Sequence, residues 1–269
     1  MILTVSHVTT YSYDTPMLSA AQSLRLFPSR FDGQRVIDWS VQVEGGTRGA
    51  MFRDGAGDKI ESWTLRGPLE AVVVRVAGQV ETTDLAGVLQ GHRETIAPEV
   101  YLRDTVPTEA DQALRDLAQS AAGASGALDT AHRLSGAVAE AIAYRPGVTH
   151  AHTTAAEALA LGEGVCQDHA HALIAMARCL EMPARYGSGY LFASEDGTPH
   201  EAAHAWAEVY IDGLGWVGFD AANRCCPDAR YIRLGSGLDA QGAAPIRGVA
   251  RGVGAESMDV TVALASAQQ

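Results

Sequence analysis

The sequence predicts an α+β fold, in which a small all-β domain precedes a core of helices followed by an antiparallel sheet. Three observations lead to this prediction. Apolar and polar residues alternate in short segments through residues 1–85, as they do in strands with one buried face. From residue 107 the apolar residues recur at three- and four-residue spacing, as in amphipathic helices. Alternation returns from residue 184, and helices that precede strands in this way indicate an α+β order.

The size and charge of the chain limit its fold and its partners. With 269 residues, 47% of them apolar, it is long enough for one large and one smaller domain. The 20 Lys and Arg against 32 Asp and Glu give a net charge of −12, and without a basic run nucleic acid is not an expected partner. The sequence has neither a signal-peptide pattern at its start nor a stretch of about 18 apolar residues, so we expect a soluble, cytoplasmic protein without a membrane partner.

Three regions follow one another along the chain. The amino-terminal β domain is expected over residues 1–85, where residues 60–65 and 72–76 alternate as strands. Through residues 86–106 the periodicity fades, which predicts a linker or crossover. Residues 107–269 then form the expected core, together with a strand near the carboxy terminus.

Helix signals in this core lead to one cysteine. Thr154 and Glu157 match a capping box ahead of a short helix that ends at Gly162. The next segment, residues 166–180, carries an apolar stripe and ends before a Met-Pro pair. Cys166 is therefore expected in the first turn of a buried helix.

The strands after this helix carry a histidine and an aspartate. Residues 203–211 and 216–220 alternate as the two strands of a hairpin. If the loop between them has an odd number of residues, such as the three residues 212–214, His204 and Asp220 lie diagonally on the same face. A shift of one residue would separate them unless a bulge corrected it.

Cysteine, histidine and aspartate in this arrangement predict nucleophilic catalysis. A cysteine attacks as a thiolate, a form that is scarce at neutral pH unless a helix N-terminus or an imidazole favours it. The backbone N–H groups around Cys166 would also favour an oxyanion. His204 can take up the thiol proton and return it to a leaving amine, while Asp220 orients the imidazole. The sequence thus predicts a Cys-His-Asp triad of Cys166, His204 and Asp220.

Five motifs also carry a resemblance to a known family. They are GVCQD at 164–168, MPARY at 182–186, SGY at 188–190, HAWAEVY at 204–210 and GWVGFD at 215–220. In order and spacing they resemble the bacterial transglutaminase-like family, and the amino-terminal β domain is similar as well. The resemblance implies a papain-like, transglutaminase-like core with Cys166 as nucleophile, His204 as base and Asp220 as its orienting partner. This chain departs from the family where Ala-Ala-Asn at 221–223 replaces Pro-Thr-Asn, and where His169 replaces an aromatic residue.

Further residues are candidates for the oxyanion site or the substrate cleft. A Tyr hydroxyl can donate to an oxyanion, and Tyr144 precedes the nucleophile at the end of a predicted helix. Gln167, next to the nucleophile, and Trp206, on the strand of His204, are the other two candidates. Each of these also fits a structural role, Gln167 by bonding nearby backbone and Trp206 by packing.

The sequence leaves other functions open. His200-Glu201-x-x-His204 has the pattern of a zinc metallopeptidase, but that pattern requires a helix, which Pro199 and the following alternation disfavour. We therefore expect no metal and no cofactor. A non-catalytic binding module is a further alternative, which the presence of all three triad residues disfavours.

The expected reaction is hydrolysis of peptide or isopeptide amide bonds, so the expected partner is a peptide or protein amide. This preference follows from the resemblance, because bacterial members of the family resemble proteases more often than cross-linking enzymes. A protein-glutamine transglutaminase, which transfers the acyl group to an amine, remains the alternative, since the same triad serves both. A homo-oligomer formed through the edges of the β domain is compatible with the pattern. The four cysteines form no disulfide pattern, and the sequence assigns no role to Cys225-Cys226.

Overall fold

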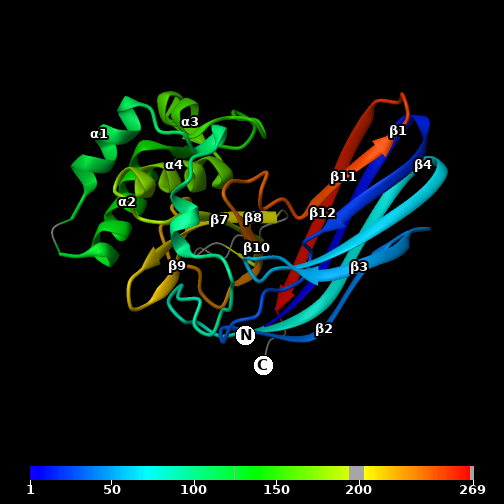
Figure 1. Ribbon diagram of the computed structural model, residues 1–269, viewed down its shortest axis with the longest axis horizontal. Coiled ribbons are helices and arrows are strands. Elements are labelled where there is room, and N and C mark those ends of the chain that lie inside the picture. Colours follow the sequence, from blue (N-terminus) through cyan, green and yellow to red (C-terminus); the bar gives the residue numbers. More distant parts are fainter. Residues whose placement is uncertain (124, 194–202, 267–269) are drawn as a thin grey trace.

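The computed structural model describes residues 1–123, 125–193 and 203–266. These residues form a twisted antiparallel sheet beside a core in which helices pack on a second sheet (Figure 1). The α+β fold class is confirmed. No helix in the described ranges is long and apolar enough to cross a membrane.

The amino-terminal sheet is built on two long strands. β1 (Ile2–Leu24) and β4 (Lys59–Thr82) pair antiparallel along most of their length, with register shifts between residues 12 and 19 of β1. β2 (Gln34–Val43) and β3 (Thr47–Arg53) pair with different halves of β4. Burial alternates along both long strands, as the sequence pattern predicts, and one face of the sheet forms a hydrophobic core.

The last two strands of the described chain complete this sheet. β11 (Ile246–Arg251) and β12 (Glu256–Ser266) both pair with β1, and Figure 1 shows them beside the amino-terminal strands. The predicted carboxy-terminal strand is thus present, and it pairs with the amino-terminal sheet. Alternation identifies a strand, but it does not specify which distant strand will be its partner.

Four helices and a four-stranded sheet make up the core. The helices are α1 (Gln112–Ala121), α2 (Ala127–Ala141), α3 (Ala155–Leu161) and α4 (Cys166–Cys179). The strands, in spatial order, are β10 (Tyr231–Gly237), β7 (Ala184–Leu191), β8 (Ala203–Ile211) and β9 (Gly215–Phe219). α4 is central, because it packs against the other three helices and against β7 and β8.

Residues 86–106, the expected linker, pair with the edge strand β9 and pack over the Trp216 and Arg185 side chains. The Leu89 N–H donates to the Trp216 carbonyl oxygen at 2.9 Å, and Val88 forms a bridge with Val217 of β9. The 3-10 turns η1 (Pro98–Leu102) and η2 (Val106–Thr108) then lead into α1. The connection is thus part of the packed core rather than a free linker.

A buried ionic network joins the two sheets. Arg233 of β10 donates to Glu208 of β8 from Nε at 2.6 Å and from Nη2 at 3.0 Å, and to Asp58 from Nη1 at 3.0 Å. Arg185 of β7 donates to the same Glu208 from Nε at 2.7 Å. Burial alone would raise the pKa of Glu208, but the charges of Arg233 and Arg185 lower it to about 2. Each of these side chains is almost fully buried, so loss of one partner would leave an uncompensated charge.

Candidate active site

Cys166 is the first residue of α4, as the sequence predicts. The helix begins there because the Asp168 carboxylate accepts hydrogen bonds from the Val165 N–H at 2.7 Å and from the Thr149 hydroxyl at 2.6 Å. A Cβ on Gly164 would lie 2.7 Å from Cβ of Asp168, so this turn requires glycine. The same Asp168 oxygen accepts both bonds. Cys166 lies in the first turn of the helix, where not every backbone N–H group has a partner within the helix.

His204 and Asp220 meet across the predicted hairpin. Ile211 pairs with Gly215, which leaves a loop of three residues and confirms the odd loop length. His204 in β8 and Asp220, directly after β9, therefore share a face, and Nε2 of the imidazole lies 2.6 Å from Oδ2 of the carboxylate. Both side chains are nearly inaccessible to solvent.

Two residues that were not among the sequence candidates complete the surroundings of Asp220. The Tyr231 hydroxyl donates to Oδ2 at 2.7 Å, and the Asn223 side-chain amide donates to the same oxygen at 2.8 Å. The Asn223 backbone N–H donates to Oδ1 at 3.1 Å. Asn223 could have been found from the Asp-x-x-Asn motif, whereas Tyr231 lies at the start of β10 and no local signal connects it to Asp220.

These contacts polarise the pair. Burial alone would raise the pKa of Asp220, but the charge of His204 and the hydrogen bonds from His204, Asn223 and Tyr231 lower it. Burial alone would lower the pKa of His204, but Asp220 and a side-chain hydrogen bond and charge from Cys166 raise it to about 10. Because Nε2 faces Asp220, we assign the hydrogen bond with the thiol to Nδ1. The structure thus brings Cys166, His204 and Asp220 into one site.

Two regions of the chain match known protein families. The model described as "Transglutaminase-like superfamily" matches residues 115–221, which contain Cys166, His204 and Asp220. The model described as "Bacterial transglutaminase-like N-terminal region" matches residues 3–81. Together the two matched regions take in most of the amino-terminal sheet and the part of the core that carries these three residues.

Two relatives and one solved structure are similar to this chain. An uncharacterized protein of Mycobacterium leprae (strain TN) is 29% identical over 276 residues, which cover 96% of this chain and 96% of the relative. An uncharacterized protein of Mycobacterium bovis (strain ATCC BAA-935 / AF2122/97) is 38% identical over 117 residues, which cover 39% of this chain and 37% of the relative. A crystal structure from Cytophaga hutchinsonii, named as that of a candidate cysteine protease, has a TM-score of 0.74 and 23% sequence identity. It covers 100% of this chain and 92% of that chain, so the two share their fold from end to end.

Within this transglutaminase-like site, Tyr144 lies close to the nucleophile. It belongs to the short strand β5 (Ala143–Tyr144), which pairs with β6 (Glu163–Gly164), so Tyr144 is beside Gly164. Its side chain is about half exposed. Burial raises its pKa first, and the charges of Cys166 and Asp220 raise it further. Its role as an oxyanion donor stays a prediction, and its location is compatible with that role.

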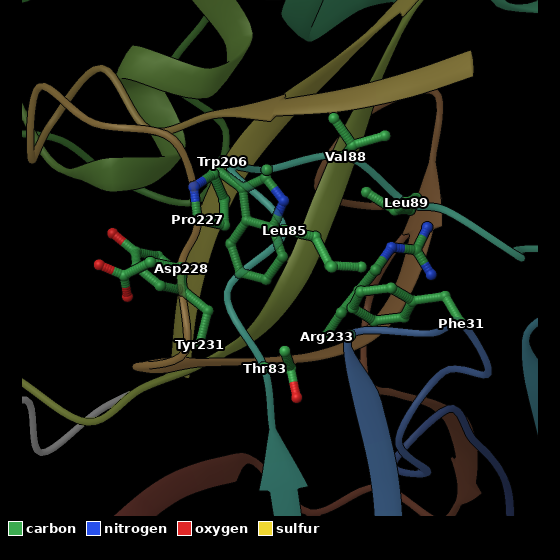
Figure 2. Close-up of a pocket in the computed structure, with 12 residues that line it drawn as sticks. Phe31, Thr83, Leu85, Val88, Leu89, Trp206, Pro227, Asp228, Tyr231 and Arg233 are labelled. Carbon is green, nitrogen blue, oxygen red and sulfur yellow. The ribbon is translucent and has the colours of Figure 1, made fainter. Parts of the chain in front are cut away.

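Gln167 and Trp206 are engaged elsewhere. The Gln167 amide donates to the Ala151 carbonyl oxygen at 3.3 Å. Trp206 is buried and packs edge-on against Tyr231, with ring centroids 5.6 Å apart. Figure 2 shows its indole on the wall of a cavity together with Leu85 and Tyr231. This cavity has a volume of about 30 Å³, roughly that of one water molecule, so it is too small to hold a peptide.

The H-E-x-x-H pattern lies partly outside the described residues, since His200 and Glu201 belong to the undescribed segment. His204 itself lies in strand β8 rather than in a helix. The zinc motif requires two imidazoles on one face of a helix. Because His204 lies in a strand, it does not supply one of them. Among the residues that the structure describes, no group of three or more His, Cys, Asp and Glu is placed to bind a metal ion.

The cysteine pair at 225–226 lies next to the site. Sγ of Cys225 is 3.3 Å from the Tyr231 hydroxyl, which in turn donates to Asp220. The backbones of Asp220 and Cys225 are also joined by two hydrogen bonds, of 2.8 and 3.1 Å. Cys225 thus helps to fix the turn that presents the aspartate.

Proposed function

We propose that this protein is a thiol-dependent acyl-transfer enzyme that hydrolyses peptide or isopeptide amide bonds with Cys166, His204 and Asp220. The observation that supports this most is the buried 2.6 Å contact between His204 Nε2 and Asp220 Oδ2, beside a cysteine at a helix N-terminus. The match of residues 115–221 to the transglutaminase-like superfamily supports the same chemistry.

The first half-reaction forms a thioester. The Cys166 thiolate attacks the amide carbonyl carbon, and the carbonyl π electrons move onto oxygen to give a tetrahedral oxyanion. Backbone N–H groups in the first turn of α4 stabilise that oxyanion, and the Tyr144 hydroxyl is a second donor in this proposal. The C–N bond then breaks, and the imidazolium of His204 gives its proton to the leaving amine.

The electrostatics of the pair suit these steps. A histidine with a pKa of about 10 carries a positive charge at neutral pH, and this charge favours a thiolate beside it. The same imidazolium is a proton donor of the right strength for an amine leaving group, because aliphatic amines have pKa values near 10. Asp220 keeps the ring oriented through both half-reactions.

Water completes the reaction in the proposed hydrolase. His204 removes a proton from the water molecule as its oxygen attacks the thioester carbonyl carbon. Collapse of the second oxyanion then breaks the C–S bond, which releases the carboxylic acid and the Cys166 thiolate. An amine that reached the thioester before water would give a transglutaminase instead. Only the acceptor differs between the two reactions, so the test must identify the product.

The test is mass analysis of a peptide library incubated with the protein, with and without a primary amine. Hydrolysis gives cleaved peptides whose masses do not change when the amine is present. Products whose mass increases by that of the amine and decreases by that of ammonia would instead show that the protein transfers the acyl group to the amine. Cys166→Ala is the inactive control, and Cys179→Ala is the matched cysteine control because Cys179 lies at the far end of α4. Equal product formation by the wild-type protein and Cys166→Ala would refute the proposal.

A further inference from the structure

Three arginines line one cavity next to the amino-terminal sheet. Arg30 follows β1, Arg53 is the last residue of β3, and Arg93 lies within residues 86–106. The cavity has a volume of about 500 Å³ and is open to solvent. It contains none of the residues of the proposed triad or their hydrogen-bond partners.

In the described ranges these arginines form no direct ion pair with an acidic residue. Within the described ranges, no ion pair of 4.0 Å or less joins Arg30, Arg53 or Arg93 to an Asp or Glu. Nearby Arg25, in contrast, pairs with Asp54 at 2.7 Å.

The arginines also disfavour one another. Burial lowers the pKa of Arg53 and the charge of Arg30 lowers it further, while Asp58 and Asp54 oppose part of this shift. Asp32 also lines the cavity, so the charged side chains among the lining residues carry a net charge of 3 − 1 = +2. A ligand with two negative charges would balance this site.

The walls of the cavity are held in place by the protein itself. The His92 imidazole contacts the carbonyl oxygens of Ala56 at 3.0 Å and Arg30 at 3.4 Å, which ties two of the arginine-bearing segments to the third. Arg53 donates from Nη1 to the Gly57 carbonyl oxygen at 2.7 Å, which positions its guanidinium. The backbone of the site and the Arg53 guanidinium are thus positioned before a ligand binds, while Arg30 and Arg93 present exposed side chains.

Two glycines allow the segments to approach so closely. Gly57 and Gly91 both line the cavity and have positive φ, +83° and +78°. A Cβ on Gly57 would lie 2.2 Å from the Arg93 carbonyl oxygen, and a Cβ on Gly91 would lie 2.3 Å from the Asp32 carboxylate. Neither position tolerates a side chain without movement of the backbone.

We propose that the cavity lined by Arg30, Arg53 and Arg93 binds a dianionic oxyanion group. The guanidinium fork matches the oxygens of both carboxylate and phosphate, and each contact is a charge-assisted hydrogen bond. A phosphate group and a dicarboxylate share this chemistry. The site is independent of the proposed hydrolysis, since none of its residues touches the triad.

The test is isothermal titration calorimetry of the full chain at low ionic strength and about pH 8, where inorganic phosphate is mostly dianionic. Inorganic phosphate and succinate are the two probes, and sodium chloride at equal ionic strength is the blank. We expect saturable binding of one equivalent that weakens as salt is added. Arg30→Gln and Arg93→Gln are each expected to weaken binding about tenfold or more, because each removes one charge-assisted contact.

Arg247→Gln is the matched control, since it removes one exposed positive charge from β11. It should bind the probes as the wild-type protein does, and so should Cys166→Ala. Unfolding temperatures without ligand establish that the variants fold. Binding of phosphate alone assigns a phosphate group, binding of succinate alone assigns a dicarboxylate, and binding of both assigns a general dianion site. The proposal is overturned if neither probe binds above the chloride blank, or if folded Arg30→Gln and Arg93→Gln bind like the wild-type protein.

Discussion

Replacing Tyr231 by Phe would remove one hydrogen bond from the aspartate of the proposed triad and preserve the surrounding packing. The hydroxyl donates to Asp220 Oδ2 at 2.7 Å in a buried site. The ring packs edge-on against Trp206, with centroids 5.6 Å apart, and Phe retains that contact. His204 and Asn223 also contact Oδ2, so the carboxylate keeps two of its three partners there.

The size of the effect follows from the charge on the acceptor. A hydrogen bond to a charged group contributes about 1.5–3 kcal/mol, and about 1.4 kcal/mol corresponds to a factor of ten in rate. If the hydroxyl keeps Asp220 ionised and aimed at His204, kcat/KM falls by about ten- to a hundredfold. That loss is smaller than the roughly 10⁴-fold loss expected for Asp220→Asn, which disturbs the imidazole tautomer itself.

The pH profile separates a positioning role from simple loss of stability. The Tyr231 hydrogen bond is one of the contacts that lower the pKa of Asp220 against the effect of burial. In Tyr231→Phe this pKa therefore rises, and the acid limb of kcat/KM moves to higher pH. A variant that is merely less stable would lose active protein without moving that limb.

The assay is kcat/KM against pH for a peptide selected from the library experiment. Tyr210→Phe is the matched control, because it removes a hydroxyl from the opposite end of β8 and keeps the edge-on contact with Trp216 at 5.4 Å. We expect Tyr210→Phe to retain wild-type kinetics. A folded Tyr231→Phe protein with kcat/KM and acid limb within about twofold of wild type would show that the hydroxyl does not support Asp220.

Three further predictions concern stability and thiol reactivity. Glu208→Gln should lower the free energy of unfolding by about 3–5 kcal/mol in denaturant titrations, whereas Glu44→Gln, at an exposed ion pair, should change it by less than about 1 kcal/mol. Because the folded-state pKa of Glu208 lies below its ordinary 4.5, its stabilisation is complete above about pH 4.5 and is lost as the pH falls toward about 2. Acid unfolding curves should therefore be less steep in Glu208→Gln, and equal slopes would contradict this assignment. Iodoacetamide at neutral pH, followed by peptide mapping, should label Cys166 before Cys179 and Cys226, since burial raises the pKa of the last two; preferential labelling of Cys226 would be inconsistent with a reactive Cys166.

Local patterns were sufficient to predict the central part of the candidate site. The capping signals before residue 166 and the apolar stripe after it place Cys166 at a helix start. The alternation of β8 and the Gly-rich turn after it specify the hairpin register that joins His204 to Asp220. These features depend on residues a few positions apart, which is the range over which periodicity and turn chemistry operate.

Contacts between distant segments could not be predicted in the same way. β12 pairs with β1 across almost the whole length of the chain, and nothing in its alternation distinguishes β1 from other partners. Tyr231 approaches Asp220 through the Asp220–Cys225 bridge and the loop that follows, which no periodic pattern encodes. The arginine cavity depends on three segments that are far apart in the sequence.

Strand β10 connects the proposed site to the amino-terminal sheet. Tyr231 and Arg233 are two residues apart, so their side chains emerge on the same face of this strand. Tyr231 holds Asp220, while Arg233 joins Glu208 of β8 to Asp58 of the amino-terminal domain. A displacement of the amino-terminal sheet that broke the Asp58 contact would therefore move the strand that holds the aspartate. The buried ion pairs of Arg233 thus join the amino-terminal domain to the core beside the proposed triad.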